Sequence, residues 1–425
     1  MTENNNDLGT APQTDSAASQ RRLRIAIVLA RPYQTFQGGD GAYVDAVVRH
    51  LSNEGHDICG LTSSVMRGRL RPVANLIYAK FLRPGWRLRG TVALGSRRIL
   101  VSPILMLQAL YDFVKALREK RLAPSWLWQA EFGEVLWLNA QLQMFRPDVT
   151  IFCFESVAMI PQMRHTGASL ALVGFLPNRG YEIGTPGVAT VQSEESLPPG
   201  LREGLLAAGA VGLNNVNDHT WWQTNPNTHN RAIFVGMCPK PFVPVADSDE
   251  DVVLFVGNKT APNIAGLGWF LEKVWPRILT QRPGTRLRVV GRVADWVKES
   301  YAGVELIGKV DDIGEEYRRA KLVVVSLTNG SAGVKTKLIE AVAHGRPFVA
   351  TTVAIEPEHR DCLIGAGFVE DEPVGFAQSV VTLLTDDKIR QAKQIGAKVV
   401  YDALFSPAAA YSDLDHWMQS LAAKN

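Results

Sequence analysis

Residues 24–41 read RIAIVLARPYQTFQGGDG, a strand-length apolar run followed by a loop that ends in glycines. The apolar residues of the next segment, 42–51, recur at helical spacing, so the pattern predicts a strand, a glycine loop and a helix. Residues 252–263, VVLFVGNKTAPN, repeat the first two parts, and a helix is predicted over 264–280. Two such openings predict two α/β domains in tandem, each built on a doubly wound parallel sheet.

Further buried-strand patterns occur in both halves of the chain. They are HDICGL, PDVTIFCF, ASLALVGF, AVGLNN and RAIFVG in the first half, and RLRVVG, VELIG, KLVVVS and RPFVAT in the second. The prolines and acidic residues of PKPFVPVADSDEDV break every periodicity between the halves. We therefore predict a disordered tail (1–22), a first domain (23–240), a linker (241–250), a second domain (251–405) and a closing helix (406–425) that returns to the first domain. The carboxyl ends of both sets of strands are expected to face a common cleft, the default ligand site.

Composition narrows the class of protein. Of 425 residues, 46% are hydrophobic, enough for a core in each domain. The formal charge of +3 does not indicate a nucleic-acid binder. The cysteines, Cys59, Cys153, Cys238 and Cys362, are widely spaced, which excludes a disulfide framework and a zinc ribbon. With no secretory core and no apolar run of spanning length, we expect a cytoplasmic protein.

The sharpest motif is LTNGSAGVKTKLIEAVAHGRPFVAT, residues 327–351. A helix is predicted to begin near Val334 or Lys335 and to end at Gly345, directly after a glycine loop. Free backbone amides and the positive end of the helix dipole bind anions, and Lys335 and Lys337 add positive charge in the first turn. Because cations there oppose the dipole, the pair favours a phosphate or diphosphate ligand. Two solvated lysines are the alternative.

Lys337 and Glu340 are three residues apart and share a helix face. As a surface ion pair, they would stabilise the folded protein by roughly a few tenths of a kcal/mol. In a binding site, Glu340 would accept hydrogen bonds from ribose hydroxyls while the lysine holds a diphosphate. Spacing alone leaves both interpretations open.

This region resembles the retaining glycosyltransferases of family four, also called group one, which have the GT-B fold. The positions that match the family motif are Gly330 to Gly333, Lys337, Glu340, Ala341, Gly345 and Pro347. Upstream, LFVGNKTAPNIAGLGWFLEKVWPRI is similar to the family's opening of the second domain, and GKVDDIGEEYRRAKLVVVSL is similar to the segment that faces the nucleobase. In the first domain, GGDGAYVDAVVRHLSNEGHDI resembles the family's N-terminal opening.

The resemblance implies a hexosyltransferase that takes its sugar from a nucleotide-diphosphate donor and retains the anomeric configuration. It implies neither a metal nor a cofactor, and a polysaccharide or lipid-linked glycan as acceptor. Gly38 and Gly39 would let the first domain close over the phosphates. The donor-binding residues that it implies are Gly38, Gly39, Gly257, Gly330, Ser331, Gly333, Lys335, Lys337 and Glu340.

The sequence departs from the family at three donor positions. Ala332 occupies the place of the first of two donor-site glutamates, as in a glycine-rich subgroup that also lacks it. Asn258 and Asn263 stand where the family has Arg and Lys, so two diphosphate cations are missing unless Lys259 or one of the motif lysines substitutes for them.

On the acceptor side, Glu155, Arg179 and Glu182 follow predicted strands and are candidates for acceptor contact or proton transfer. No catalytic acid or base can be assigned. Two rival functions stay open: a non-catalytic GT-B protein that binds a nucleotide or glycan and serves in assembly, and a sugar-nucleotide epimerase.

Residues 65–121 form a basic, apolar insert with 13 Lys or Arg and 2 acidic residues. Cations alternate there with aromatic and aliphatic residues, as in an interfacial membrane helix. We therefore expect peripheral contact with an anionic membrane surface on its cytoplasmic face. A cationic surface over buried helices and an acidic polymer acceptor are the alternatives; no motif for nucleic acid accompanies the charge.

Overall fold

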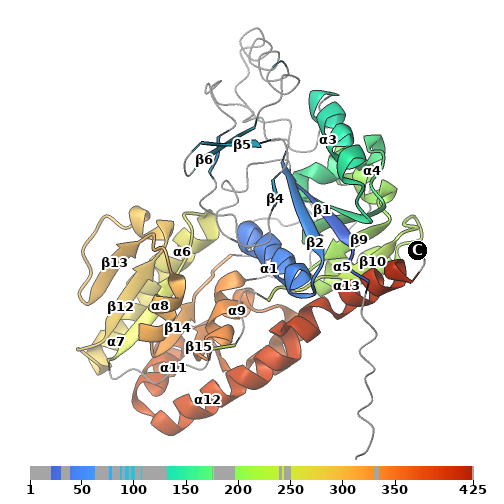
Figure 1. The fold of residues 1–425 in the computed structure, drawn as a ribbon. Coiled ribbons are helices and arrows are strands. Elements are labelled where there is room, and N and C mark those ends of the chain that lie inside the picture. The colour runs from blue at the N-terminus through green and yellow to red at the C-terminus, as the bar shows by residue number, and fades with distance from the viewer. Residues whose placement is uncertain are drawn as a thin grey trace, which may run out of the picture.

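The computed structural model describes residues 21–29, 39–62, 76–78, 87–88, 91–94, 97–100, 107, 132–174, 176, 197–238, 242–243, 250–329 and 335–423. The described chain forms two α/β domains, each with a parallel sheet between helices (Figure 1). This arrangement confirms the predicted fold class.

The first domain contains a seven-stranded parallel sheet of order β10-β9-β8-β7-β1-β2-β4. Its strands are β1 (Arg24–Leu29), β2 (Asp57–Thr62), β4 (Arg87–Leu88), β7 (Val149–Cys153), β8 (Ala168–Gly174), β9 (Ala210–Leu213) and β10 (Arg231–Phe234). Its helices are α1 (Gly39–Asn53), α3 (Phe132–Phe145), the 3-10 helix η3 (Phe154–Gln162), α4 (Pro199–Ala207) and α5 (Val216–Thr224). Every residue of β7 and β9 is buried, as continuous apolar runs in a parallel sheet require.

The second domain contains a six-stranded parallel sheet of order β13-β12-β11-β14-β15-β16. Its strands are β11 (Val252–Val256), β12 (Arg286–Val290), β13 (Val304–Gly308), β14 (Leu322–Val325), β15 (Phe348–Ala350) and β16 (Gly367–Val369). Its α-helices are α6 (Ala261–Trp269), α7 (Trp275–Gln281), α8 (Ile313–Arg319), α9 (Thr336–Ala343), α10 (Arg360–Leu363), α11 (Pro373–Thr385) and α12 (Asp387–Val400). Short 3-10 turns are η6 (Arg292–Trp296), η7 (Thr352–Ala354) and η8 (Pro357–His359).

The helix predicted over 264–280 is not a single α-helix. A π-helical turn, η5 (Phe270–Val274), separates α6 from α7. Pro276 follows at the start of α7, and a proline has no amide hydrogen to donate within a helix. The missing donor accounts for the break in the α-helical pattern at this point.

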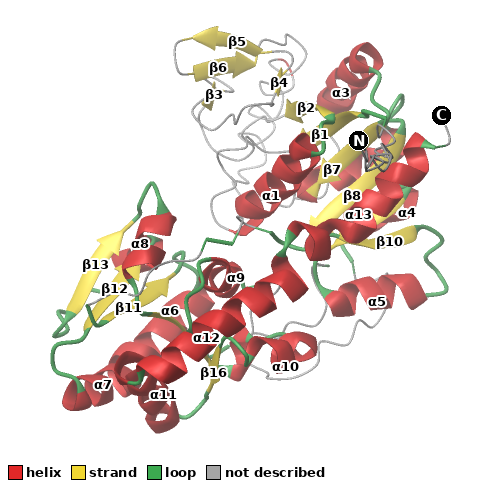
Figure 2. Cartoon of the chain, turned by 60° about the horizontal axis from the view of Figure 1, so that its bottom comes forward, coloured by secondary structure: helices red, strands yellow, loops and turns green. Residues whose placement is uncertain are grey.

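The C-terminal helix α13 (Pro407–Ala422) joins the two domains. It follows α12 and the π-turn η9 (Tyr401–Phe405), and together they run from the second domain across to the first (Figure 2). Asp413 accepts a hydrogen bond from the Phe234 amide at the edge strand β10 (3.2 Å), and Asp415 pairs with His50 of α1 (2.7 Å). The first domain is therefore completed by residues from the end of the chain.

The described part of the basic insert contains strands. β3 (Leu76–Tyr78), β5 (Thr91–Leu94) and β6 (Arg97–Leu100) form a three-stranded antiparallel sheet, and β4 pairs with β2 of the first domain. The comparison with an interfacial helix is wrong for these residues. In the sequence, the runs TVAL and RRIL are separated by the dipeptide Gly-Ser, a pattern that is typical of a hairpin.

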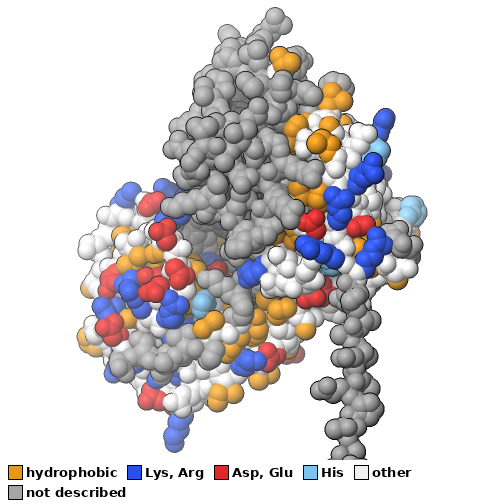
Figure 3. Space-filling view, viewed as in Figure 1, with side chains coloured by type: hydrophobic (Ala, Val, Ile, Leu, Met, Phe, Trp, Pro, Cys, Tyr) orange, Lys and Arg blue, Asp and Glu red, His pale blue; other side chains and the backbone are white. Residues whose placement is uncertain are grey.

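Charges of both signs are intermixed on the face of the second domain in Figure 3. Arg288 pairs with Glu316 (2.7 Å) and with Glu305, and Arg318 pairs with Glu315 (2.7 Å). The face seen in Figure 3 presents no broad field of one sign on its described residues.

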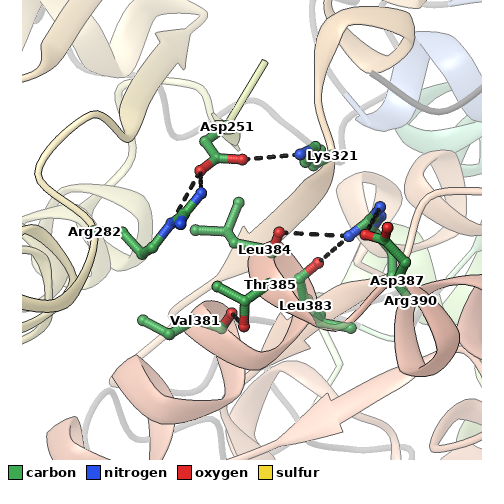
Figure 4. Close-up of polar contacts among 9 residues, drawn as sticks. All are labelled: Asp251, Arg282, Lys321, Val381, Leu383, Leu384, Thr385, Asp387 and Arg390. Atoms are coloured by element: carbon green, nitrogen blue, oxygen red, sulfur yellow. Dashed lines mark hydrogen bonds and ion pairs between the residues drawn. The ribbon is translucent and has the colours of Figure 1, made fainter. Parts of the chain in front are cut away.

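Arg390 of α12 holds the end of the preceding helix in place. Its side chain, 3% exposed, donates hydrogen bonds to the Leu383 carbonyl (3.0 Å) of α11 and to the carboxylate of Asp387 (2.6 Å) (Figure 4). The carbonyls of the last helical turn have no partner within the helix, so a buried helix end needs such a donor. Arg390 thereby joins α11 to α12.

Replacing Arg390 with methionine is expected to lower the free energy of unfolding by about 2 kcal/mol, because a buried carbonyl loses its partner. Asp387→Ala removes the ion pair, whose carboxylate is 73% exposed, and a favourable charge in the first turn of α12, and should cost about 1 kcal/mol or less. Urea denaturation of both variants measures the difference. If both variants lose the same stability, the contribution of Arg390 comes from its ion pair with Asp387 and not from its hydrogen bond to the end of α11.

Candidate functional site

A cavity of about 250 Å³ lies between the two domains. The first domain lines it with residues that follow β9 and β10, including Asn214 and Met237. The second domain contributes Lys335 and Leu338 at the start of α9, and Glu356 after β15. The cavity is thus at the carboxyl ends of strands from both sheets, where ligands bind in open α/β folds.

Helix α9 lines this cavity with the apolar side chains of Leu338 and Ile339. Lys337 and Glu340, which are half-buried, form a polar face of the helix that is not part of the cavity lining. Lys335 is the N-cap residue of the helix and is also half-buried. The sequence pattern therefore places both lysines at the positive end of the helix dipole, as predicted.

Helix α6 brings a second element to the same place. A Cβ on Gly266 would lie 2.1 Å from the Ser326 carbonyl oxygen, so only glycine lets α6 approach the end of β14 this closely. Asn263, in the first turn of α6, is consequently within reach of α9. The side-chain Nδ2 of Asn263 also donates a hydrogen bond to the Asn258 backbone carbonyl (3.0 Å), which connects Asn263 to the loop after β11.

The ammonium group of Lys337 donates a hydrogen bond to Oδ1 of the Asn263 side chain. It also lies 5.4 Å from the centre of the Phe255 ring, at cation–π distance. Asn263 is one of the two positions at which the sequence lacks a cation that the resembling family has. Of the three lysines considered as substitutes, Lys337 is the one whose charge contacts this position.

The surroundings of Lys335 and Lys337 in the folded protein disfavour the charged form of both side chains. Burial, together with the neighbouring charge of Lys335, lowers the pKa of Lys337 to about 7, although Glu340 acts in the opposite direction. Burial also lowers the pKa of Lys335, and the carboxylate of Glu356 offsets part of that effect. A bound anion would relieve both penalties because it favours the protonated forms.

Glu340 has a partner that the sequence analysis did not identify. The hydroxyl of Tyr317, on α8, donates a hydrogen bond to Glu340 Oε2 (2.9 Å). Burial, followed by the charge of Glu340, raises the pKa of Tyr317 well above its ordinary value, so the phenol keeps its proton.

Two hydrogen bonds connect the domains beside the cavity. Asn215 donates to Glu356 (3.3 Å), and Asn217 donates to Glu358 (3.3 Å). His359 lies 3.3 Å from Glu356 in the same cluster. These side chains lie on either side of the domain boundary, so any motion that opens the cavity at this point has to separate them.

The structure locates some of the predicted site residues. Lys335, Lys337, Glu340 and Gly257 come from adjoining elements of the second domain, with Asn263 between Gly257 and Lys337. Gly39 is the first residue of α1, and Glu155 follows β7 in η3. The remaining candidates lie outside the described residues: Gly38, Gly330, Ser331, Gly333, Arg179 and Glu182.

No group of three or more His, Cys, Asp or Glu in the described part is placed to hold a metal ion. None of the helices described here has the length and apolar character needed to cross a membrane.

The chain is similar to known proteins both in sequence and in fold. Residues 250–386 match the family model described as glycosyl transferases group 1. An uncharacterized 44.6 kDa protein in the cps region of Klebsiella pneumoniae is 28% identical over 144 residues, which is 30% of this chain and 36% of that protein. The chain thus spans about a third of the length of this curated relative.

Solved structures are similar over more of the chain. Sucrose-phosphate synthase from Thermosynechococcus elongatus has a TM-score of 0.64 at 17% identity, covering 95% of this chain and all of that one. A TarM mutant from S. aureus, in complex with Fondaparinux, alpha-GlcNAc-glycerol and UDP, has a TM-score of 0.51 at 13% identity, covering 68% of this chain and 59% of that one. The two described domains therefore share the GT-B fold, and the second domain is similar in sequence to the group 1 glycosyl transferases.

Proposed function

We propose that the protein is a glycosyltransferase that moves a hexose from a nucleotide-diphosphate sugar to a polysaccharide or lipid-linked glycan. The observation that carries this proposal is the pair Lys335 and Lys337. Two desolvated lysines stand at one helix N-terminus, in the domain that matches group 1 glycosyl transferases. Such a site costs stability and is useful only when an anion binds there.

In this proposal the diphosphate lies against the start of α9. Lys337, placed beside Asn263, contacts it from the α6 side, and Lys335 contacts it from the side of the cavity. As the bond to the sugar breaks, negative charge develops on the leaving diphosphate. Fixed cations in a partly desolvated cleft stabilise that charge more strongly than water does. Glu340 accepts hydrogen bonds from the ribose hydroxyls.

The acceptor binds on the first domain, and closure of the two domains excludes water from the donor. Retention of configuration and independence from a metal are proposed from the family resemblance alone. UDP in the TarM complex and the cps region of the Klebsiella relative support a nucleotide donor and a glycan acceptor. We further propose that the protein acts in the cytoplasm and that its basic insert contacts the membrane surface.

Calorimetric titration with UDP, GDP and ADP tests the proposal. We expect one of the three to bind the wild-type protein, and Lys335→Ala to weaken that binding about tenfold, the usual value of a hydrogen bond to a charged group. Lys393→Ala is the matched control. Burial also lowers the pKa of Lys393, which lies over the Phe368 ring (4.7 Å) but lines no part of the cavity.

Sugar donors of the nucleotide that binds are then tested for turnover with glycan acceptors. Release of the nucleoside diphosphate that depends on the acceptor supports the transferase. If none of the three nucleotides binds, or if both lysine variants lose the same affinity, the proposed donor site is wrong.

A further inference from the structure

The side chain of Tyr317 connects helix α8 to the polar face of α9. Its hydroxyl is 2.9 Å from Glu340 Oε2 and 3.3 Å from the Lys337 carbonyl oxygen, and the residue is 0% exposed. A neutral phenol has one hydrogen to donate, and the carboxylate is the nearer and the charged acceptor. The hydrogen bond to Glu340 is therefore the dominant one.

The ring that carries this hydroxyl has little freedom to move. It stacks on the His344 ring at 4.9 Å and 10°. The Tyr317 carbonyl accepts a hydrogen bond from Arg346 Nε (2.9 Å), and Arg346 is itself fully buried. The phenol is thus fixed from three directions, through its ring, its backbone and its hydroxyl.

Glu340, in contrast, is half-buried and has a flexible side chain. A free glutamate side chain samples many rotamers, and ordering it costs on the order of 1–2 kcal/mol. A hydrogen bond from a rigid donor removes part of that freedom before any ligand arrives. Preorganisation of this kind strengthens binding because the ordering cost is already met in the free protein.

We infer that Tyr317 is a positioning residue that holds the Glu340 carboxylate ready to accept hydrogen bonds from the vicinal hydroxyls of a ribose. This inference rests on the proposed function and deepens it. Tyr317 touches neither the sugar nor the diphosphate. Its effect is confined to the part of the affinity that depends on the two ribose hydroxyls.

The test compares UDP with 2′,3′-dideoxy-UDP by calorimetry, or the matching guanosine or adenosine pair if that base is the one that binds. We expect the wild type to prefer the ribonucleotide about tenfold or more, since a charged acceptor loses its partners in the dideoxy complex. Tyr317→Phe should reduce this preference about threefold to tenfold while leaving the affinity for the dideoxy nucleotide unchanged.

Tyr301→Phe is the matched control, because Tyr301 also donates to a glutamate of the second domain, Glu299 (3.2 Å), but at the surface. It should change neither affinity. Glu340→Asp gives a second route, since it withdraws the carboxylate from the phenol by one methylene. It should lose the same preference, and adding Tyr317→Phe to it should have no further effect.

The outcomes distinguish a failure of the proposed function from a failure of the positioning role of Tyr317. If the wild type binds no nucleotide, the proposed function and this inference both fail. If the wild type prefers the ribonucleotide and Tyr317→Phe keeps that preference, only the positioning role is wrong. Equal weakening of both nucleotides in Tyr317→Phe would show a purely structural role and would also overturn the inference.

Discussion

Replacing Lys337 with methionine is expected to weaken nucleotide binding about a hundredfold and, at the same time, to stabilise the folded protein. The loss of affinity follows from removing a desolvated cation beside the diphosphate. The gain in stability has the same cause, because the ammonium group is unfavourable in the free protein. Methionine keeps the length of the side chain and its contact with the Phe255 ring without the charge.

The sign of the stability effect follows from the direction of the pKa shift. Lys337 has a pKa of about 7 in the folded protein and near 10.5 when unfolded. The unfolded chain therefore binds the proton more tightly, so the penalty is complete below pH 7 and disappears as the pH rises toward 10.5. We expect Lys337→Met to gain about 1–3 kcal/mol at pH 6.5, allowing for partial exposure and the lost bond to Asn263.

Urea denaturation at pH 6.5 and 9.5, together with calorimetric titration, measures both effects. Lys393→Met should gain less stability, because burial alone lowers the pKa of Lys393 and its hydrogen bond to the Ile364 carbonyl (2.7 Å) is lost, and it should bind the nucleotide normally. If Lys337→Met binds the nucleotide as tightly as the wild type does, the diphosphate does not contact Lys337. If Lys337→Met is less stable than the wild type at pH 6.5, the hydrogen bond of Lys337 to Asn263 contributes more stability than the desolvation of the ammonium group costs.

Nucleotide binding is expected to weaken as the pH rises from 7.5 to 9, by up to tenfold per unit. Over this range the diphosphate is already fully ionised, so its own titration does not contribute. Lys337, whose pKa is about 7 in the free protein, must take up a proton to pair with the anion. Burial also lowers the pKa of Lys335, which adds to the effect in the same direction.

Titrations at pH 8 in buffers of different ionisation enthalpy should show net uptake of a proton on binding. Lys337→Arg keeps the charge and does not titrate in this range, so most of the pH dependence should vanish in that variant. If the affinity of the wild type is constant from pH 7.5 to 9, the lysine is already protonated in the free protein and the proposed linkage is wrong.

The strands were predictable because burial on both faces of a parallel sheet demands continuous apolar runs. RIAIVL and VVLFV show this pattern at β1 and β11. Strand β16 (GFV) gives no such signal, because its two apolar side chains lie between Gly367 and the acidic residues 370–372. In the insert, the alternation of cations with apolar residues suggested a helix at an interface, whereas the β-forming runs determine the structure of the described part.

The site was predictable only where its residues are close in the sequence. Lys335, Lys337 and Glu340 fall within one helix, so helical spacing alone groups them. Tyr317 is 23 residues from Glu340, and Asn263 is 74 residues from Lys337. Contacts at such separations depend on how α6 and α8 pack against α9. The local indication in the sequence that Tyr317 is buried was its place as the single aromatic residue in the charged segment EEYRRA.

The position of α13 has a consequence for how the chain matures during synthesis. The first domain leaves the ribosome first, yet its edge strand β10 and helix α1 hydrogen-bond to residues of α13. These partners emerge only after the whole second domain has been translated. The first domain therefore cannot form these contacts until the second domain has been synthesised. Until then its edge strand β10 is exposed to chaperones and to other nascent chains.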